Sequence, residues 1–387
     1  MRKEFLPFAK PLVSEAAISD VADSIRKGWL AMGPKTIDFE QKFAKYVGCR
    51  FAVSVNSATA GLHLSAMAMI KPGDEVITTA MTFASTVNAV IYAGGRPVLV
   101  DINPHTFNID PDAVEAAITS KTKAIIPVHF AGRPCDMDAL EDIAKRHDLA
   151  IIEDSAHALG AAYKGKKIGC GKGARHIAVC SFQPTKNITT GEGGMICTDD
   201  EDAAEQMSMQ RQNGMSKGAW NRYQAHGKAH YDIFMPGLKY QMMDIQAAIG
   251  RDQLTHLEEF NQRRRAIVAR YQREFADVDG LILPPNVEDG NVHSWHIYTP
   301  LIDIDKLGFT RDEFMQQMGQ RNIGTAYHYQ ALHLFTCYGK MTGLKAGDLP
   351  NAEYVSERIV SLPLFPAMTD DDVNDVIAAV KDVCHAK

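Results

Sequence analysis

The sequence lacks the marks of several common protein classes. Its seven cysteines stand singly along the chain without a CxxC pair, which argues against a disulfide framework. No stretch approaches 18 uninterrupted apolar residues, so no membrane-spanning helix is predicted. The first residues have neither the apolar core nor the small-residue cleavage site of a secretory signal. We therefore expect a soluble protein of a reducing, cytoplasmic compartment.

A basic excess is also missing. The formal net charge of -6 argues against a general nucleic-acid binder. Lysines and arginines are scattered, apart from the short run 263–265 in a predicted helix, which we expect to form a solvent-exposed face. Apolar residues make up 45% and charged residues 23%, as is usual for a soluble globular protein.

What is present is a repeated strand–helix rhythm from about residue 51. The strand-like runs are continuously apolar, which is typical of strands buried on both faces of a mostly parallel sheet. We predict strands over 51–55, 75–79, 97–101, 123–128, 149–154, 176–182 and 194–198. Helical patterns lie between them, among them 59–68, 111–118 and 138–147. This rhythm predicts an α/β fold with helices on both sides of a mixed, mostly parallel sheet.

At residue 242 the pattern changes to one long helix that continues to residue 275. A chain of 387 residues is expected to form two domains. We expect the long helix to join a large domain of residues 1–250 to a smaller α+β domain of residues 251–387. In the smaller domain we predict a strand over 296–304 and helices over 311–320 and 370–382.

Lys186 follows a predicted strand in the segment SFQPTKNITTGEGG, residues 181–194. A lysine can form a Schiff base with an aldehyde when desolvation or a nearby cation deprotonates its amine. Taken alone, a lysine is more often a surface residue.

Asp154 closes another buried strand, in the sequence Glu-Asp-Ser-Ala-His that ends at His157. Ligands bind at the carboxyl ends of strands in open α/β sheets, and an Asp there can keep a pyridine nitrogen protonated. The alternative is that Asp154 caps a following helix.

Small residues from Asn56 to Gly61 lie between a strand and a helical pattern. Backbone N–H groups at such a helix start can bind a phosphate, although a simple Ser cap has the same pattern. The GK[ST] ending of a nucleoside-triphosphate loop is missing, so ATP binding is not indicated.

Two histidine pairs have the spacing of zinc ligands, His226 with His230 and His293 with His296. Neither pair has a third ligand nearby or a clear helical context. We therefore predict no metal site.

Four features follow one another along the chain in an order that suits a flat, phosphorylated aldehyde. They are the small residues of the helix start, the aromatic Phe83, the Asp at one strand end and the Lys at another. On these residues the chain resembles the DegT/StrS-type sugar aminotransferases, which are fold-type-I pyridoxal-phosphate enzymes. The likeness runs from GWLAMGPKTIDFEQKFA (28–44) to SLPLFPAMTDDDV (361–373). The sequence motifs are most similar to those of transaminases that make UDP-4-amino-4-deoxy-L-arabinose. The matching motifs are GPK, SATAG, AAITSKTKAIIPVHFAG, AWNR at Trp220 and SERIVSLPLFP.

The resemblance implies roles for individual residues. Lys186 would hold the cofactor as a Schiff base and move protons, Asp154 would pair with the pyridine nitrogen, and His157 would lie near the ring oxygen. Phe83 would stack on the ring. The amides of Ala58 and Thr59 and the hydroxyl of Ser181 would bind the phosphate, with Ser57 less firmly implied.

Substrate contacts are implied for Gln183, Lys228, Lys239 and His328. Many relatives have His or Tyr where this chain has Gln183, which puts the sugar contact of that residue in doubt. Many also have Asn-Tyr-Arg where this chain has Lys239-Tyr240-Gln241, and that Asn reaches the cofactor phosphate across a dimer interface. Either Lys239 or Lys228 could replace it.

The implied reaction is a ping-pong transfer from L-glutamate to a nucleotide-linked keto sugar, with pyridoxamine phosphate formed between the halves. The implied assembly is a homodimer with shared active sites. Related sugar 3-dehydratases have histidine in place of the lysine, so Lys186 argues against that reaction. An amino-acid aldolase or decarboxylase of the same fold type stays open.

Overall fold

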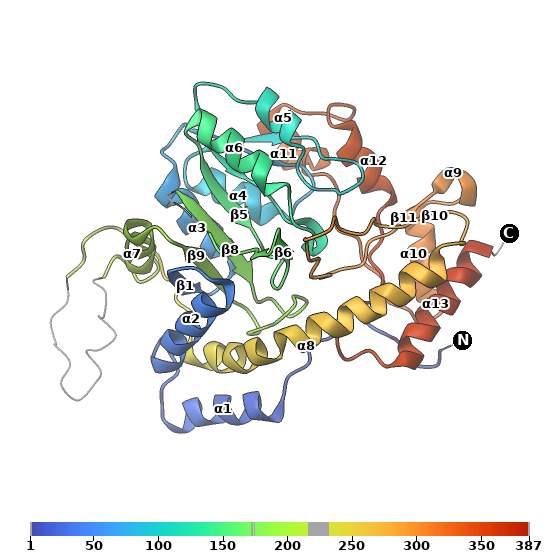
Figure 1. Cartoon of the computed structure of the whole chain (residues 1–387), viewed down its shortest axis with the longest axis horizontal. Coiled ribbons are helices and arrows are strands. Elements are labelled where there is room, and N and C mark those ends of the chain that lie inside the picture. Colours follow the sequence, from blue (N-terminus) through green and yellow to red (C-terminus); the bar gives the residue numbers. More distant parts are fainter. Residues whose placement is uncertain (1, 172, 174, 216–231, 386–387) are drawn as a thin grey trace.

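The computed structural model (Figure 1), which describes residues 2–171, 173, 175–215 and 232–385, is built around a seven-stranded sheet. The strand order is β1-β9-β8-β5-β4-β2-β3, and only β9 runs antiparallel to its neighbours. The bounds are β1 Phe51–Val55, β2 Glu75–Thr79, β3 Arg96–Val100, β4 Thr122–Ile126, β5 Ala150–Asp154, β8 His176–Ser181 and β9 Gly194–Thr198. The predicted mostly parallel sheet is confirmed.

Helices cover both faces of this sheet (Figure 1). Their bounds are α1 Glu15–Arg26, α2 Pro34–Val47, α3 Ala58–Met69, α4 Ala84–Tyr92, α5 Pro111–Ala116, α6 Met137–His147 and α7 Glu201–Gln210. Successive residues of β5 show the two faces: Ile152 packs in a cluster with α3, and Ile151 packs in another with α6. Because side chains alternate along a strand, Asp154 faces the α3 side and Glu153 the α6 side.

The predicted long helix is α8, Asp244–Phe275, which crosses the molecule in Figure 1. Near its middle, Leu257 and Phe260 pack against α2, and near its end Tyr271 and Phe275 pack among the C-terminal helices. These include α10 Arg311–Gln320 and α13 Asp370–His385. The two chain ends lie on this same side of the molecule (Figure 1). The division at residues 250 and 251 falls within α8 and stays a prediction.

The rest of the C-terminal region is made of short elements. They are β10 Leu281–Ile282, β11 Leu301–Ile302, α9 Ile304–Leu307, α11 Thr336–Thr342 and α12 Pro350–Arg358. Between β5 and β8 the chain forms a separate two-stranded hairpin of β6 Ala162–Tyr163 and β7 Lys166–Lys167. The predicted strand over 296–304 is wrong except at β11. Pro300 has no N–H for a ladder, and Trp295 has a positive φ of 48°, so the chain makes isolated bridges instead.

The basic run 263–265 is not a uniformly exposed face, which corrects the sequence prediction. Arg264 is only 2% exposed. Its guanidinium donates hydrogen bonds to the carbonyls of Trp295, His296 and Leu364, at 3.4, 3.0 and 2.8 Å. A buried guanidinium is tolerated when its N–H groups find acceptors, and here those acceptors are loop carbonyls. Arg264 therefore ties the long helix to the loops around His296.

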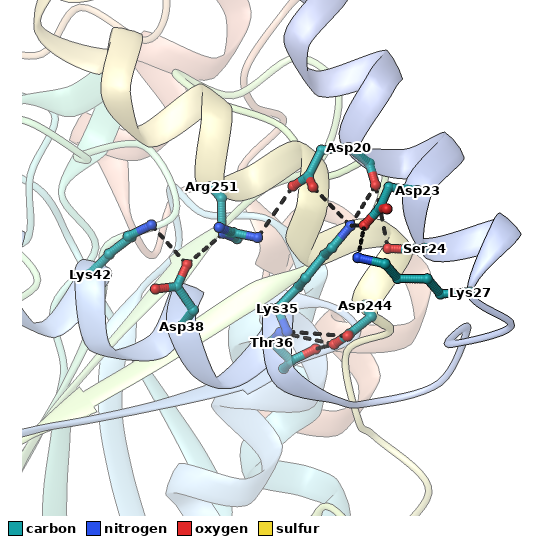
Figure 2. Close-up of polar contacts among 10 residues, drawn as sticks. All are labelled: Asp20, Asp23, Ser24, Lys27, Lys35, Thr36, Asp38, Lys42, Asp244 and Arg251. Carbon is teal, nitrogen blue, oxygen red and sulfur yellow. Dashed lines mark hydrogen bonds and ion pairs between the residues drawn. The ribbon is translucent and has the colours of Figure 1, made fainter.

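The start of α8 is fixed by a polar network with α1 and α2 (Figure 2). The buried carboxylate of Asp244 accepts hydrogen bonds from the backbone N–H groups of Lys35 and Thr36 and from the Thr36 hydroxyl, at 3.1, 2.9 and 2.6 Å. Asp244 thus satisfies the free N–H groups at the first turn of α2. The Lys35 ammonium reaches back to Asp20 and Asp23 of α1, at 2.8 and 3.1 Å.

We expect the substitution Asp244→Ala to lower the free energy of unfolding by roughly 2–4 kcal/mol, because it leaves buried donors without an acceptor. The matched control is Asp23→Ala, which removes a carboxylate that is 38% exposed and pairs with lysines. Such a surface pair contributes about 0–1 kcal/mol. Urea unfolding of both variants measures the difference, and equal losses would contradict a special role for the buried cap.

Candidate functional site

A cavity of about 440 Å³ opens at the carboxyl ends of the parallel strands, where ligands bind in open α/β sheets. Its lining comes from the ends of β5 and β8, the start of α3, the turn before α4 and a C-terminal loop. The lining residues are Ser57, Ala58, Thr59, Thr82, Phe83, Ser85, Val128, Asp154, Ala156, His157, Ser181, Gln183, Lys186, Glu192, His328 and Tyr329. The structure thus gathers most of the predicted site residues in one place.

Lys186 lies in the turn after β8, where its backbone N–H donates to the Gln183 carbonyl at 2.9 Å. Its side chain is partly buried, and its amine lies within hydrogen-bond distance of Nε2 of His296, at 3.5 Å. Burial lowers the pKa of the amine to about 8, against a pull upward by Asp154. Next to it, buried Asn187 donates to the side-chain oxygen of Asn261 on α8 at 2.7 Å, which anchors the turn.

Asp154 is 5% exposed at the end of β5. Its Oδ2 accepts a hydrogen bond from the Thr86 hydroxyl at 2.8 Å, and Thr86 in turn accepts one from Thr82 at 2.7 Å. Its Oδ1 accepts from the N–H of Ala156 at 3.2 Å in a turn, and no helix follows, so the helix-cap alternative is not what the fold shows. Burial raises the pKa of Asp154 despite these bonds, so a nearby cation would stabilise its carboxylate.

The start of α3 lies directly against the sheet. The Ser57 hydroxyl caps the helix by accepting from the N–H of Ala60 at 3.1 Å. This leaves Ala58 and Thr59 in the first turn, whose N–H groups have no partner within a helix. A Cβ on Gly194 of β9 would lie 2.7 Å from the N atom of Ala58, so only glycine there allows this approach. Free N–H groups at a helix start favour an anion.

Neutral histidines surround the Lys186 amine. Burial and the nearby Lys186 lower the pKa of His157 and His296 well below the ordinary value, and that of His328 to about 3. His157 Nδ1 accepts from the N–H of Ala131 at 3.3 Å, so its Nε2 carries the proton and donates to the Tyr329 hydroxyl at 2.9 Å. Tyr329 and Thr86 lie outside the predicted site, and His296 was predicted only as one of a histidine pair with the spacing of zinc ligands.

The predicted substrate contacts divide into two groups. Gln183 and His328 line the cavity. The Oε1 atom of Gln183 accepts hydrogen bonds from the backbone N–H and the hydroxyl of Thr185, and Nδ1 of His328 is hydrogen-bonded to the Ser361 hydroxyl at 2.8 Å. Lys239 is exposed outside the lining and donates to Gln241 at 2.6 Å. Lys228, with His226, His230 and Trp220, lies outside the described residues.

The other histidine pair does not point to a metal. His293 stacks on Trp295 with ring centroids 3.7 Å apart, whereas His296 reaches the Lys186 amine. In the described ranges, no group of three or more His, Cys, Asp or Glu residues is arranged so that it could hold a metal ion. Likewise, no helix in the part of the chain that the structure describes is long and apolar enough to cross a membrane.

The sequence model of the DegT/DnrJ/EryC1/StrS aminotransferase family matches residues 11–381. The chain belongs to this family. The aminotransferase is 50% identical to the uncharacterized protein MJ1066 of Methanocaldococcus jannaschii over 384 residues, which covers 99% of this chain and 98% of that protein. It is 46% identical to the spore coat polysaccharide biosynthesis protein SpsC of Bacillus subtilis over the same length and shares of the chains.

Solved structures agree with the fold of this aminotransferase. The putative sugar aminotransferase Spr1654 of Streptococcus pneumoniae, in its pyridoxamine-phosphate form, has a TM-score of 0.90 at 34% identity over 98% of this chain and 99% of that chain. PseC of Helicobacter pylori, an aminotransferase of pseudoaminic acid biosynthesis, has a TM-score of 0.91 at 26% identity over both whole chains. Spr1654 is also known in a pyridoxal-phosphate form. The aminotransferase described here is a pyridoxal-phosphate enzyme.

The cavity of this aminotransferase fits that cofactor on its own chemistry. An amine of lowered pKa suits an aldehyde carbon, and a buried carboxyl suits a protonated ring nitrogen. Free N–H groups at the start of α3, with the Ser181 hydroxyl nearby in the lining, suit a phosphate. Phe83, 60% exposed at the start of α4, offers an aromatic face to the same cavity.

Proposed function

We propose that this aminotransferase moves the amino group of L-glutamate to a nucleotide-linked keto sugar, most simply a UDP-4-keto sugar, for a surface polysaccharide or lipopolysaccharide. The observation that carries the proposal is the opening of the Lys186 amine into the same cavity as the buried carboxyl of Asp154. The printed roles of SpsC in spore coat polysaccharide and of PseC in pseudoaminic acid biosynthesis support a sugar acceptor.

The residues of this chain would divide the work as follows. Pyridoxal phosphate, when bound, carries the amino group between the two substrates and accepts electron density from the bond that is broken. Lys186 would hold it covalently and Asp154 would keep a proton on its ring nitrogen. Ala58, Thr59 and Ser181 would bind the phosphate, Phe83 would cover one ring face, and His157 would lie near the ring oxygen.

Proton movement falls to Lys186. With a pKa of about 8, a useful fraction of the amine is neutral near pH 7 and can accept a proton, and the ammonium can return it. The neutral histidines around it cannot compete for that proton, because burial and the nearby Lys186 lower their own pKa values. Gln183 and His328, on the cavity wall, are our proposed contacts to the sugar.

We further propose a homodimer in which the second subunit completes the site. Large apolar side chains are exposed at Phe83, which lines the cavity, and at Tyr92, Ile233 and Phe234. Exposed apolar side chains that gather in one patch are typical of an interface, and we propose that the second subunit covers these residues. Lys239 and Lys228 are our proposed contacts to the partner's cofactor phosphate.

The test is the visible absorption spectrum of the cofactor-loaded protein before and after L-glutamate, followed by a panel of keto-sugar nucleotides. We expect the yellow band to bleach with stoichiometric release of 2-oxoglutarate, and to return with one acceptor of the panel. The Lys186→Arg variant is the control that keeps the positive charge without a primary amine. 2-Oxoglutarate must restore the band by reversing the first half-reaction, so it is removed before the panel is added. Return with a UDP-4-keto sugar, and not with other keto acids, then identifies the acceptor class.

Other outcomes would overturn parts of the proposal. A band that persists with glutamate would exclude glutamate as the donor. Release of carbon dioxide or of an aldehyde from an amino acid, without 2-oxoglutarate, would instead identify a decarboxylase or an aldolase. Bleaching that no keto sugar reverses would exclude the sugar acceptor.

A further inference from the structure

His296 stands apart from the other histidines of the site because one ring nitrogen meets the Lys186 amine and the other has no partner among the described residues. It is 2% exposed, and its ring packs against that of His157 with centroids 4.5 Å apart. Its Nε2 meets the Lys186 amine at 3.5 Å. Nothing in the motifs of the sequence connects residue 296 with residue 186, and only the fold brings them together.

The other nitrogen of the ring is unsatisfied. Among the described residues, Nδ1 of His296 has no hydrogen-bond partner although it is fully buried. Buried polar groups are nearly always paired, and an unpaired one costs free energy. The ammonium form of Lys186 can only donate, so with it Nε2 accepts and the neutral ring carries its proton on Nδ1. A histidine that served only to fill the core would be expected to have this donor satisfied.

The backbone around His296 is held firmly from three sides. The Arg264 guanidinium donates to the His296 carbonyl at 3.0 Å, and the N–H of His296 donates to the Ala131 carbonyl at 3.0 Å. The preceding Trp295 has a left-handed conformation with φ of 48°, fixed by its N–H donating to Nδ1 of His293 at 2.9 Å. Such conformations persist only where surrounding contacts enforce them. The ring is thus aimed at Lys186 at a cost in backbone strain.

We infer that His296 is a positioning residue for Lys186, whose Nε2 accepts a hydrogen bond from the free amine and holds it toward the cavity whenever the amine is not bonded to the cofactor. The inference rests on the proposed role of Lys186. In this role His296 orients the Lys186 amine and makes no contact with the substrate. His296 would act in capture of the cofactor and in each return of the amine to its resting place.

His296 is suited to accept a hydrogen bond from the Lys186 amine but not to remove the proton of that amine. The charged or titratable groups around it are Lys186, Arg264, His157 and His328, and burial followed by these neighbours lowers the pKa of His296 well below the ordinary value. A neutral acceptor stabilises the ammonium of Lys186 relative to the bare cavity. Removal of that acceptor therefore lowers the pKa of Lys186 further and frees the amine to rotate.

The experiment uses His296→Leu, which removes the acceptor, and His296→Gln, whose amide oxygen can replace Nε2. The matched control is His293→Asn, which changes a second buried histidine of the same segment and keeps an acceptor for the N–H of Trp295. The first readout is the rate at which cofactor-free protein regains its yellow band with pyridoxal phosphate, measured across pH. The second is the split between kcat and KM for L-glutamate, and thermal melting monitors folding.

We expect the wild-type capture rate to rise through an inflection near pH 8, where the amine becomes neutral. In His296→Leu the inflection should move down by about one unit, and kcat should fall roughly 10- to 100-fold with KM little changed, as for loss of a hydrogen bond to a charged group. His296→Gln should recover most of both values. His293→Asn should keep the wild-type inflection.

An unchanged inflection and kcat in folded His296→Leu would overturn the inference. So would equal effects of His296→Gln and His296→Leu, because a role in packing alone gives no recovery by the amide. If His296→Leu does not fold, His296→Asn takes its place, because its shorter amide cannot reach the Lys186 amine, and it should move the inflection down where His296→Gln does not. Failure of the wild-type protein to regain the band would count against the proposed role of Lys186 and not against His296.

Discussion

Lys186→Ala is expected to lower kcat by at least roughly 10⁴-fold while leaving the folded structure unchanged, because one side chain provides both the covalent attachment and the proton transfers. The lysine lines an open cavity and its amine makes one hydrogen bond, so its removal enlarges that cavity and leaves no hole in the packed core. The variant should bind pyridoxal phosphate only non-covalently and should lack the covalent adduct that sodium borohydride forms in the wild type by reducing the Schiff base.

Lys186→Arg distinguishes loss of the amine from loss of charge at this position. The guanidinium stays protonated at all accessible pH values and does not form a Schiff base, so it should be as inactive as alanine. Mass spectrometry of the reduced protein should place the cofactor adduct on Lys186 in the wild type and on no lysine in either variant. Turnover by either variant, or an adduct at another lysine, would contradict the assignment.

Asp154→Asn is expected to lower kcat by roughly 10²- to 10³-fold with the cofactor still bound, as for removal of one preorganised charge from an active site. The amide matches the carboxylate in shape but cannot keep a proton on the ring nitrogen. Burial already raises the pKa of Asp154, so its charge depends on a cation beside it, and the pair is mutually stabilising. Stopped-flow spectra with L-glutamate measure the rate of the first half-reaction directly.

Glu153→Gln is the matched control, because Glu153 is the neighbouring buried carboxylate on the opposite face of the sheet. Its carboxylate oxygens are hydrogen-bonded to Nε2 of His129 at 2.8 Å and to Nε2 of His176 at 2.6 Å, away from the cavity. This substitution should lower the free energy of unfolding by roughly 1–3 kcal/mol and leave kcat of the folded enzyme nearly unchanged. Equal losses of kcat in both variants would show that Asp154 acts through the fold alone.

The strands and the residues at their ends were predictable because each carries a local signal. A run such as AIIED predicts a buried strand by itself, and the carboxyl end of a parallel strand is where an Asp meets a ligand. The order of Asp154 and Lys186 after their strands, with a helix start rich in small residues, therefore located the cavity. The long helix was equally visible, with its start predicted two residues early, at 242 in place of Asp244.

The rest depends on contacts between distant segments, which leave no local pattern. His296 and Tyr329 reach the site from loops more than 100 residues after Asp154. Three successive arginines give no indication of which one turns inward, and Arg264 is buried because of the loops that it meets. The strand predicted over 296–304 failed because apolar character does not reveal that Pro300 and the left-handed Trp295 interrupt pairing.

Asn261 and Arg264 lie three residues apart on one face of α8, and they hold the loops of Lys186 and His296, respectively. Each residue of an α-helix adds about 100° of rotation and ~1.5 Å of rise. One residue inserted between Asp244 and Asn261 would turn both supports away from the site while the capped start of the helix stayed in place. The number of residues between Asp244 and Asn261 therefore sets the direction of both supporting side chains, and this spacing is as much a part of the active site as the side chains that touch the cofactor.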